Sequence, residues 1–156
     1  MPRVRVIGCG NPDAGDDAVG LLATDRVRDR VPEDVEVVTA PTALHVLDLL
    51  EGAASVILVD ATRTAGEERP AGTLVRVEAG PDGLPALRSS LSSHGVGLAE
   101  AIGLAAALGD GPRVVFLGVE VGDVRMGAGL SPVVEGALPG LVDAIVDEVA
   151  AEEARP

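Results

Sequence analysis

The sequence predicts an α/β fold in three layers: a mostly parallel sheet of five strands with helices on both faces. Short apolar runs of strand length alternate along the chain with segments of helical periodicity, a pattern typical of this class. The run Val56–Val59 is uninterrupted, as expected of a central strand that is buried on both faces. A chain of 156 residues fits one domain, so we expect residues 1–156 to form a single unit.

Apolar runs and helical spacing locate the elements in order. The expected strands are Val4–Ile7, Val35–Val38, Val56–Val59, Thr73–Val77 and Val114–Val119. The expected helices are Asp17–Val31, Ala43–Leu50, Leu98–Leu108 and a last one from Ser131 to about Ala151. Gly52 and Gly109 can end the second and third helices. Ser131-Pro132 is a typical helix start, and Pro139 could kink the last helix.

Charge and composition exclude two kinds of partner. The formal net charge is −13, and such an acidic surface repels phosphate backbones. The chain has no Trp or Tyr and a single Phe, so stacking on bases is not available either. We therefore expect no nucleic-acid partner. No apolar run approaches the ~20 residues that a membrane span needs, so we expect no membrane partner.

The single cysteine, Cys9, bears on both compartment and chemistry. One cysteine cannot form an internal disulfide, and the N-terminal segment lacks the apolar core of a signal peptide, so we expect a cytoplasmic protein. Cys9 lies between two glycines in a tight turn after the first strand. We expect it to be a small buried side chain rather than a nucleophile. His45 lies within a helical pattern and is also expected to be structural.

Polar side chains occur where ligands bind in such folds. Ligands of parallel sheets lie beyond the carboxyl ends of the strands. Asp16 and Asp17 follow the first strand, and Asp60 follows the third. His94 lies in a loop of Gly and Ser ahead of the third helix. Carboxylate and imidazole ligands suit divalent ions such as Zn, Ni or Mn, and three protein ligands leave positions open for water or substrate.

Each of these residues also has a simpler interpretation. Asp16 or Asp17 could merely cap the first helix, where the helix dipole favours a carboxylate. His94 could lie in a flexible surface loop. Asp60 is harder to explain as structural, because a carboxylate at the end of a buried strand is costly unless it is paired or coordinated.

Three other kinds of site fit less well. A dinucleotide-binding turn needs G-x-G-x-x-G, but Asp13 occupies its sixth position, and the second strand does not end in an acidic residue. A phosphoacceptor receiver domain resembles this pattern of acids but needs a lysine after the fifth strand, and the chain has no lysine. A serine hydrolase would carry G-x-S-x-G at a strand-to-helix turn, and the chain has no such motif.

A series of motifs resembles, in the right order, those of the hydrogenase maturation proteases, and the resemblance spans nearly the whole chain. The matching stretches are Gly8-x-Gly10-Asn11, Gly15–Gly20, Val56–Ala61, Ser93–Leu98, Phe116–Glu120 and Gly129–Pro132. The family fold that this implies is a twisted five-stranded sheet between helices, which agrees with the elements above. The resemblance also implies that Asp17, Asp60 and His94 are the metal-binding and catalytic residues, with Asp16 as an acidic neighbour.

The resemblance implies an endopeptidase that removes the C-terminal extension of a nickel–iron hydrogenase large-subunit precursor after nickel insertion. The substrate would supply the Ni²⁺, and Zn or Cd could replace it in vitro. The metal could polarise the scissile carbonyl or activate water, or a carboxylate could act as a general base. The alternative is a non-catalytic metal-binding assembly factor on the same fold. One departure bears on substrate identity, because the family's second strand usually ends in Asp-Gly-Gly-Thr and here reads Thr39-Ala40-Pro41-Thr42.

Overall fold

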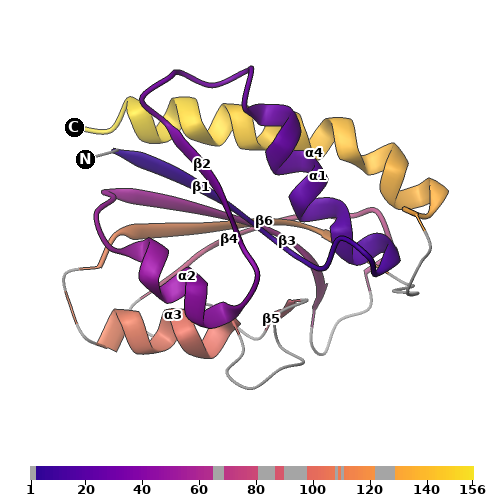
Figure 1. Ribbon diagram of the computed structural model, residues 1–156, viewed down its shortest axis with the longest axis horizontal. Helices are drawn as coiled ribbons and strands as arrows, with labels where there is room; N and C mark the ends of the chain where they lie inside the picture. The colour runs from indigo at the N-terminus through magenta and orange to yellow at the C-terminus, as the bar shows by residue number, and fades with distance from the viewer. Residues whose placement is uncertain are drawn as a thin grey trace.

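A mixed sheet forms the centre of the molecule (Figure 1). The computed structural model describes residues 3–64, 69–80, 87–89, 98–107, 109, 111–121 and 129–156. The strands are β1 (Val4–Cys9), β2 (Glu36–Ala40), β3 (Ser55–Thr64), β4 (Leu74–Glu78), β5 (Leu87–Ser89) and β6 (Arg113–Glu120). Their order is β2-β1-β3-β6-β4, with β5 paired to β3. The first four strands of this order are parallel, whereas β4 and β5 run antiparallel to their partners.

Helices cover both faces of this sheet, which confirms the predicted three-layer α/β class. They are η1 (Gly15–Ala18), α1 (Val19–Val27), α2 (Ala43–Leu50), α3 (Leu98–Ala107) and α4 (Pro132–Glu153). Figure 1 shows α1 and α4 on one face and α2 and α3 on the other. Among the described residues, no helix is long and apolar enough to cross a membrane.

Side chains of β3 alternate between the two apolar cores, one on each face of the sheet. Ile57 and Val59 belong to the apolar core under α1 and α4, whereas Val56 and Leu58 belong to the core under α2 and α3. Successive side chains of a strand point to opposite faces. Asp60 therefore extends the row of Val56 and Leu58 and points to the face of α2 and α3.

The first predicted helix is shorter than expected. We expected it over Asp17–Val31, but residues 15–18 form the tighter η1, and α1 ends at Val27. Pro32 disfavours helical backbone at Val31, the predicted end, and residues 28–30 form a turn. Asp17 is consequently part of a turn and not of the helix itself.

The predicted third strand is longer than expected, and Asp60 lies within it rather than after it. Pairing with β6 continues through Asp60 to Thr62, and β5 pairs with the last residues as far as Thr64. Backbone pairing therefore outweighs the polar side chain at position 60. The three-residue β5 is too short to give a signal in the sequence. Pro139 does not interrupt α4.

Glycine allows α1 to lie directly on the ends of β1 and β3. A Cβ atom at Gly20 would be 2.6 Å from the carbonyl oxygen of Cys9, 2.5 Å from that of Val59 and 2.9 Å from Cα of Asp60. These are backbone atoms, which cannot move aside as a flexible side chain could. A side chain at this position would therefore push the start of α1 away from Asp60.

We expect Gly20→Ala to lower the free energy of unfolding by about 1–3 kcal/mol, the usual cost of forcing an extra carbon into a packed interior. Gly136→Ala is the matched control, because Gly136 is also helical but a Cβ there would have no atom within 4 Å. It should stabilise the protein by about 0.5–1 kcal/mol. Urea unfolding of both variants measures this. Equal effects would contradict the close packing at Gly20.

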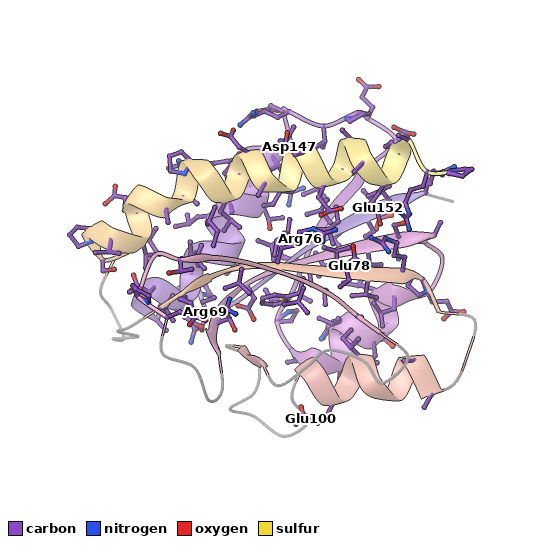
Figure 2. All side chains as sticks on the ribbon, turned by 180° about the vertical axis from the view of Figure 1, so that it is seen from behind. Arg69, Arg76, Glu78, Glu100, Asp147 and Glu152 are labelled. Atoms are coloured by element: carbon purple, nitrogen blue, oxygen red, sulfur yellow. The ribbon has the colours of Figure 1, made fainter. Side chains whose placement is uncertain are left out.

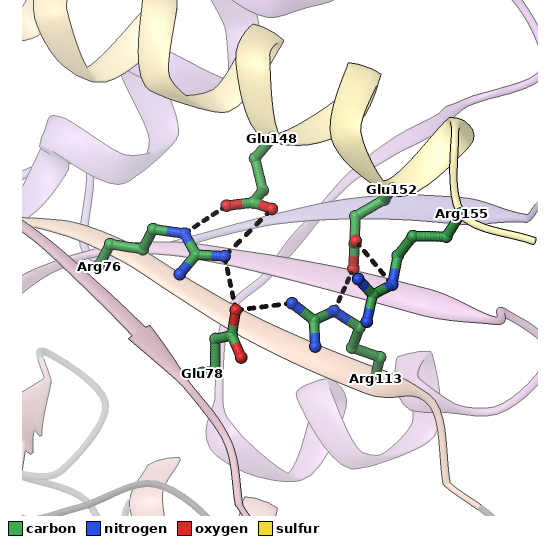
Figure 3. Close-up of polar contacts among 6 residues, drawn as sticks. All are labelled: Arg76, Glu78, Arg113, Glu148, Glu152 and Arg155. Atoms are coloured by element: carbon green, nitrogen blue, oxygen red, sulfur yellow. Dashed lines mark hydrogen bonds and ion pairs between the residues drawn. The ribbon is translucent and has the colours of Figure 1, made fainter.

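Ion pairs fasten α4 to the strands beneath it (Figure 3). Arg76 Nε donates to Glu148 at 2.6 Å, and Arg113 Nε donates to Glu152 at 2.8 Å. Glu78 accepts from both arginines, and these hydrogen bonds, the one from Arg113 first, lower the pKa of its carboxyl. Figure 2 shows Arg76, Glu78 and Glu152 together between α4 and the sheet. Glu152 is only 1% exposed, so its arginine partner matters for stability.

Arg113→Met should lower the free energy of unfolding by about 1–3 kcal/mol, because the buried Glu152 carboxylate then keeps only Arg155, at 3.5 Å, of its two ion-pair partners. Arg30→Met is the control, because Arg30, which follows α1, also forms an ion pair with a residue of α4. Arg30 pairs with Asp143 at 3.0 Å, but both side chains are about half exposed, so the loss should stay below about 1 kcal/mol. Chemical unfolding that finds equal losses would show that α4 is not held by its buried pairs.

Candidate active site

The loop after β1 is closed by its own backbone and by Asp17. Gly10 has a φ of 142°, and a Cβ atom there would lie 2.1 Å from the Asp17 carbonyl oxygen, so only glycine fits. Ala14 N–H donates to the Asn11 carbonyl at 3.2 Å, and Asp17 N–H donates to that of Ala14 at 3.0 Å. Asn11 N–H in turn donates to Asp17 Oδ2 at 3.1 Å. These bonds hold the largely buried Asp17 carboxylate over the start of the loop.

Asp16 has a different task from the one its position suggested. We considered it as a cap of the first helix, but α1 begins after Ala18 and η1 begins after Ala14, so neither aspartate occupies a cap position. Asp16 instead accepts hydrogen bonds from Ser131, the N-cap residue of α4, through the backbone N–H at 2.6 Å and Oγ at 2.9 Å. It therefore joins the loop to a helix far away in the sequence.

Asp60 lies at the carboxyl end of the sheet, in β3, which pairs with β1 on one side and with β6 on the other. It is fully buried, pairs in register with Gly118 of β6, and its Oδ1 accepts from the Ala61 N–H at 2.8 Å. Gly8 pairs with Val59, which places Cys9 beside Asp60. Burial and then the negative charge of Asp60 raise the pKa of the Cys9 thiol. A neutral, fully buried thiol agrees with the small structural side chain that we predicted.

The structure brings two of the three predicted ligands to the same end of the sheet. η1 lies against β3, so the segment that carries Asp17 packs against the strand that carries Asp60. His94 lies outside the described residues. Within the part of the chain that the structure does describe, no group of three or more metal-ligating side chains comes together. The described site thus consists of two buried carboxylates, and its predicted third ligand stays a prediction.

A buried carboxylate that we did not single out, Glu120, lies on the same face. It is 4% exposed, and its backbone pairs in register with Thr62, two residues beyond Asp60. In β6 it extends the row of Val114 and Phe116, which belong to the core under α2 and α3. The sequence held the same signal as for Asp60, an acidic residue at the end of a buried apolar run, and that signal could have found it.

The segment that departs from the family pattern leads from β2 into α2. Thr42 is the N-cap of α2, and its Oγ1 accepts from the His45 N–H at 3.2 Å. The His45 ring lies on the exposed side of the helix, with Nδ1 3.1 Å from the same oxygen. This contact agrees with the structural role predicted for His45. It also gives Thr42 a role in starting the helix that does not depend on Thr39, Ala40 or Pro41.

Both the sequence and the fold of the chain resemble those of known proteins. A family model, HycI, hydrogenase maturation protease, matches residues 24–148. The hydrogenase maturating endopeptidase HybD from E. coli superimposes with a TM-score of 0.74 at 19% identity, covering 96% of this chain and 93% of that one. The [NiFe] hydrogenase maturation protease HycI from Thermococcus kodakarensis KOD1 gives a TM-score of 0.68 at 22% identity, covering 96% and 93%.

A hydrogenase 2 maturation peptidase from Thaumarchaeota archaeon SCGC_AB-539-E09 gives a TM-score of 0.65 at 25% identity, covering 94% of this chain and 97% of that one. A search of curated proteins finds no match. The structural likenesses support the fold, and the family match extends over well more than half of the chain. The protein therefore belongs to the hydrogenase maturation protease family, and it is a protease.

Proposed function

We propose that this protease removes a C-terminal extension from the large-subunit precursor of a nickel–iron hydrogenase after nickel has been inserted. One observation carries the proposal beyond family membership: two buried carboxylates, Asp17 and Asp60, lie on elements that pack together at the carboxyl end of the sheet. This is where α/β folds bind ligands. We place the reaction in the cytoplasm, as the single cysteine of the sequence led us to expect.

The donor set fits a divalent ion. Two carboxylates held near each other repel, and a bound cation relieves that repulsion. Asp17, Asp60 and His94 together would supply oxygen and imidazole donors, which suit nickel and leave room for ligands from the precursor. Burial and then the charge of Asp60 raise the pKa of the Cys9 thiol in the metal-free protein, and Cys9 is not part of the proposed donor set. The nickel is thus part of the substrate, and the protease recognises it.

Positioning is the main contribution of the chain to catalysis. Asn11 orients the Asp17 carboxylate, and the Ala61 N–H orients that of Asp60, so both are fixed before the precursor arrives. Binding the nickel of the precursor would place the scissile bond beside these groups. The metal would polarise the carbonyl or activate a water molecule, and a carboxylate of the site would accept the proton of that water.

Purified protein should cleave a nickel-loaded precursor and leave the nickel-free precursor intact. Asp60→Asn should slow cleavage at least about 100-fold, the lower range of what a general base contributes. Asp147→Asn removes one exposed acidic charge from α4 and should leave the rate unchanged (Figure 2). Mass spectrometry of the released peptide measures both rates.

Equal cleavage of the loaded and empty precursors would contradict recognition through nickel. A lack of cleavage of every candidate precursor would favour the non-catalytic assembly factor instead.

The free protein should bind Ni, Zn or Cd weakly through the same residues. A ligand at about one hundred times its dissociation constant stabilises the native state by about 2.7 kcal/mol. Millimolar metal should therefore raise the melting temperature by about 2–8 °C. The increase should nearly disappear in Asp60→Ala and in His94→Ala and persist in His45→Ala. It should also fade below about pH 6, where a protonated imidazole cannot bind metal.

Differential scanning fluorimetry across this set measures the effect. The same increase in the wild type and in both ligand variants would mean that the ion binds elsewhere on this acidic surface.

A further inference from the structure

Asp16 is a buried carboxylate that the proposed chemistry does not use. It is 2% exposed, and both of its oxygens accept hydrogen bonds from Ser131. Burying a carboxylate is costly unless such bonds compensate for the lost water. The two residues are 115 positions apart in the sequence. These hydrogen bonds can therefore offset the cost of burying Asp16 only in the folded protein. Because Asp16 is buried and directly precedes Asp17, its contact with Ser131 is part of the packed interior beside the site.

The position of Ser131 is fixed, because this residue is the N-cap of the longest helix of the described structure. Its Oγ accepts from the Val134 N–H at 3.4 Å as the N-cap of the 22-residue α4. A carboxylate at this end also meets the partial positive charge of the helix dipole. The body of α4 packs against α1, and the Arg113–Glu152 pair holds its far end. Ser131 is thus fixed relative to the sheet.

The geometry of η1 sends the two neighbouring carboxylates in different directions. A 3₁₀ helix has three residues per turn, so consecutive side chains diverge by about 120°. Asp16 points to α4, while Asp17 reaches back to the Asn11 N–H at 3.1 Å. Because the two residues share one short turn, fixing the first restricts the orientation of the second.

We propose that Asp16 and Ser131 form a positioning pair, which holds η1 against the start of α4 and thereby orients the Asp17 carboxylate. That Asp17 binds the metal rests on the proposed function; that it is oriented by this pair does not. Groups that orient metal ligands from behind typically contribute 10–100-fold in metal affinity. The motif in the loop after β1 and the Ser131-Pro132 motif would then act together to orient Asp17.

Four variants test this pair. Asp16→Ala removes both hydrogen bonds, whereas Ser131→Ala removes the one from Oγ and keeps the one from the backbone N–H. The double variant combines the two changes, and Ser131→Thr keeps the hydroxyl. Arg113→Met is the matched control, because it loosens the far end of the same helix and leaves η1 untouched. It separates the loss of positioning from a general loss of stability.

The first readout is the backbone amide of Asn11, which reports the orientation of Asp17 without any metal. Its NMR resonance should shift, and its hydrogen exchange should speed up at least about tenfold, in Asp16→Ala. Both effects should be smaller in Ser131→Ala, which keeps the bond from the backbone N–H to Asp16. The resonance and the exchange rate should stay as in the wild type in Ser131→Thr and in Arg113→Met. A role confined to capping α4 would not move this amide.

The second readout is cadmium affinity, measured by calorimetric titration. Asp16→Ala should weaken it about tenfold or more, and Ser131→Ala should weaken it less, because the backbone N–H of residue 131 still donates to Asp16. The double variant should be no weaker than Asp16→Ala, which already removes both hydrogen bonds.

An unchanged Asn11 amide in Asp16→Ala would overturn the positioning role, whatever the protein cleaves. A perturbed amide with equal cadmium affinity in the wild type, Asp16→Ala and Asp17→Ala would support the positioning role and contradict the proposed metal site.

Discussion

The first turn of α1 lies directly against the ends of β1 and β3, because residue 20 is a glycine and has no Cβ atom. At Gly20 the backbone of the helix lies against the carbonyls of Cys9 and Val59 and against Cα of Asp60. This contact decides where η1 can lie and therefore how far Asp17 is from the strand that carries Asp60. The ion pairs of α4 and the two apolar cores stabilise the layers around it, and the site depends on their rigidity.

Adjacent acids in the loop after β1 divide the work of building the site. Asp17 faces the strand ends, and Asp16 faces the start of α4. Both are buried. The bond from the Asn11 N–H to Asp17 closes the loop, and the bonds from Ser131 to Asp16 join the loop to α4. In our proposal, the acidic pair of the motif meets two needs: Asp17 serves the chemistry, and the nearly fully buried Asp16 serves the placement of its neighbour.

Much of this architecture could be predicted from the sequence, because its signals are local. The strands are apolar runs, and α2 begins after Thr42, a cap residue, and ends at Leu50, as predicted. Asp60 stood out as an acid at the end of such a run. The hydrogen bonds from Ser131 to Asp16 could not be predicted, because they join residues 115 positions apart. The extension of β3 also depends on pairing with β6 and β5, which a single strand does not reveal.

Anomalous diffraction from a cadmium-soaked crystal tests most directly whether Asp17 and Asp60 serve one ion. A shared metal site requires a single strong peak within bonding distance of a carboxylate oxygen of both residues and of the imidazole of His94. The peak should disappear in crystals of Asp60→Asn, a variant that keeps the shape of the side chain and removes its charge. A peak bonded to only one of the two aspartates, or one that persists in Asp60→Asn, would contradict a shared metal site.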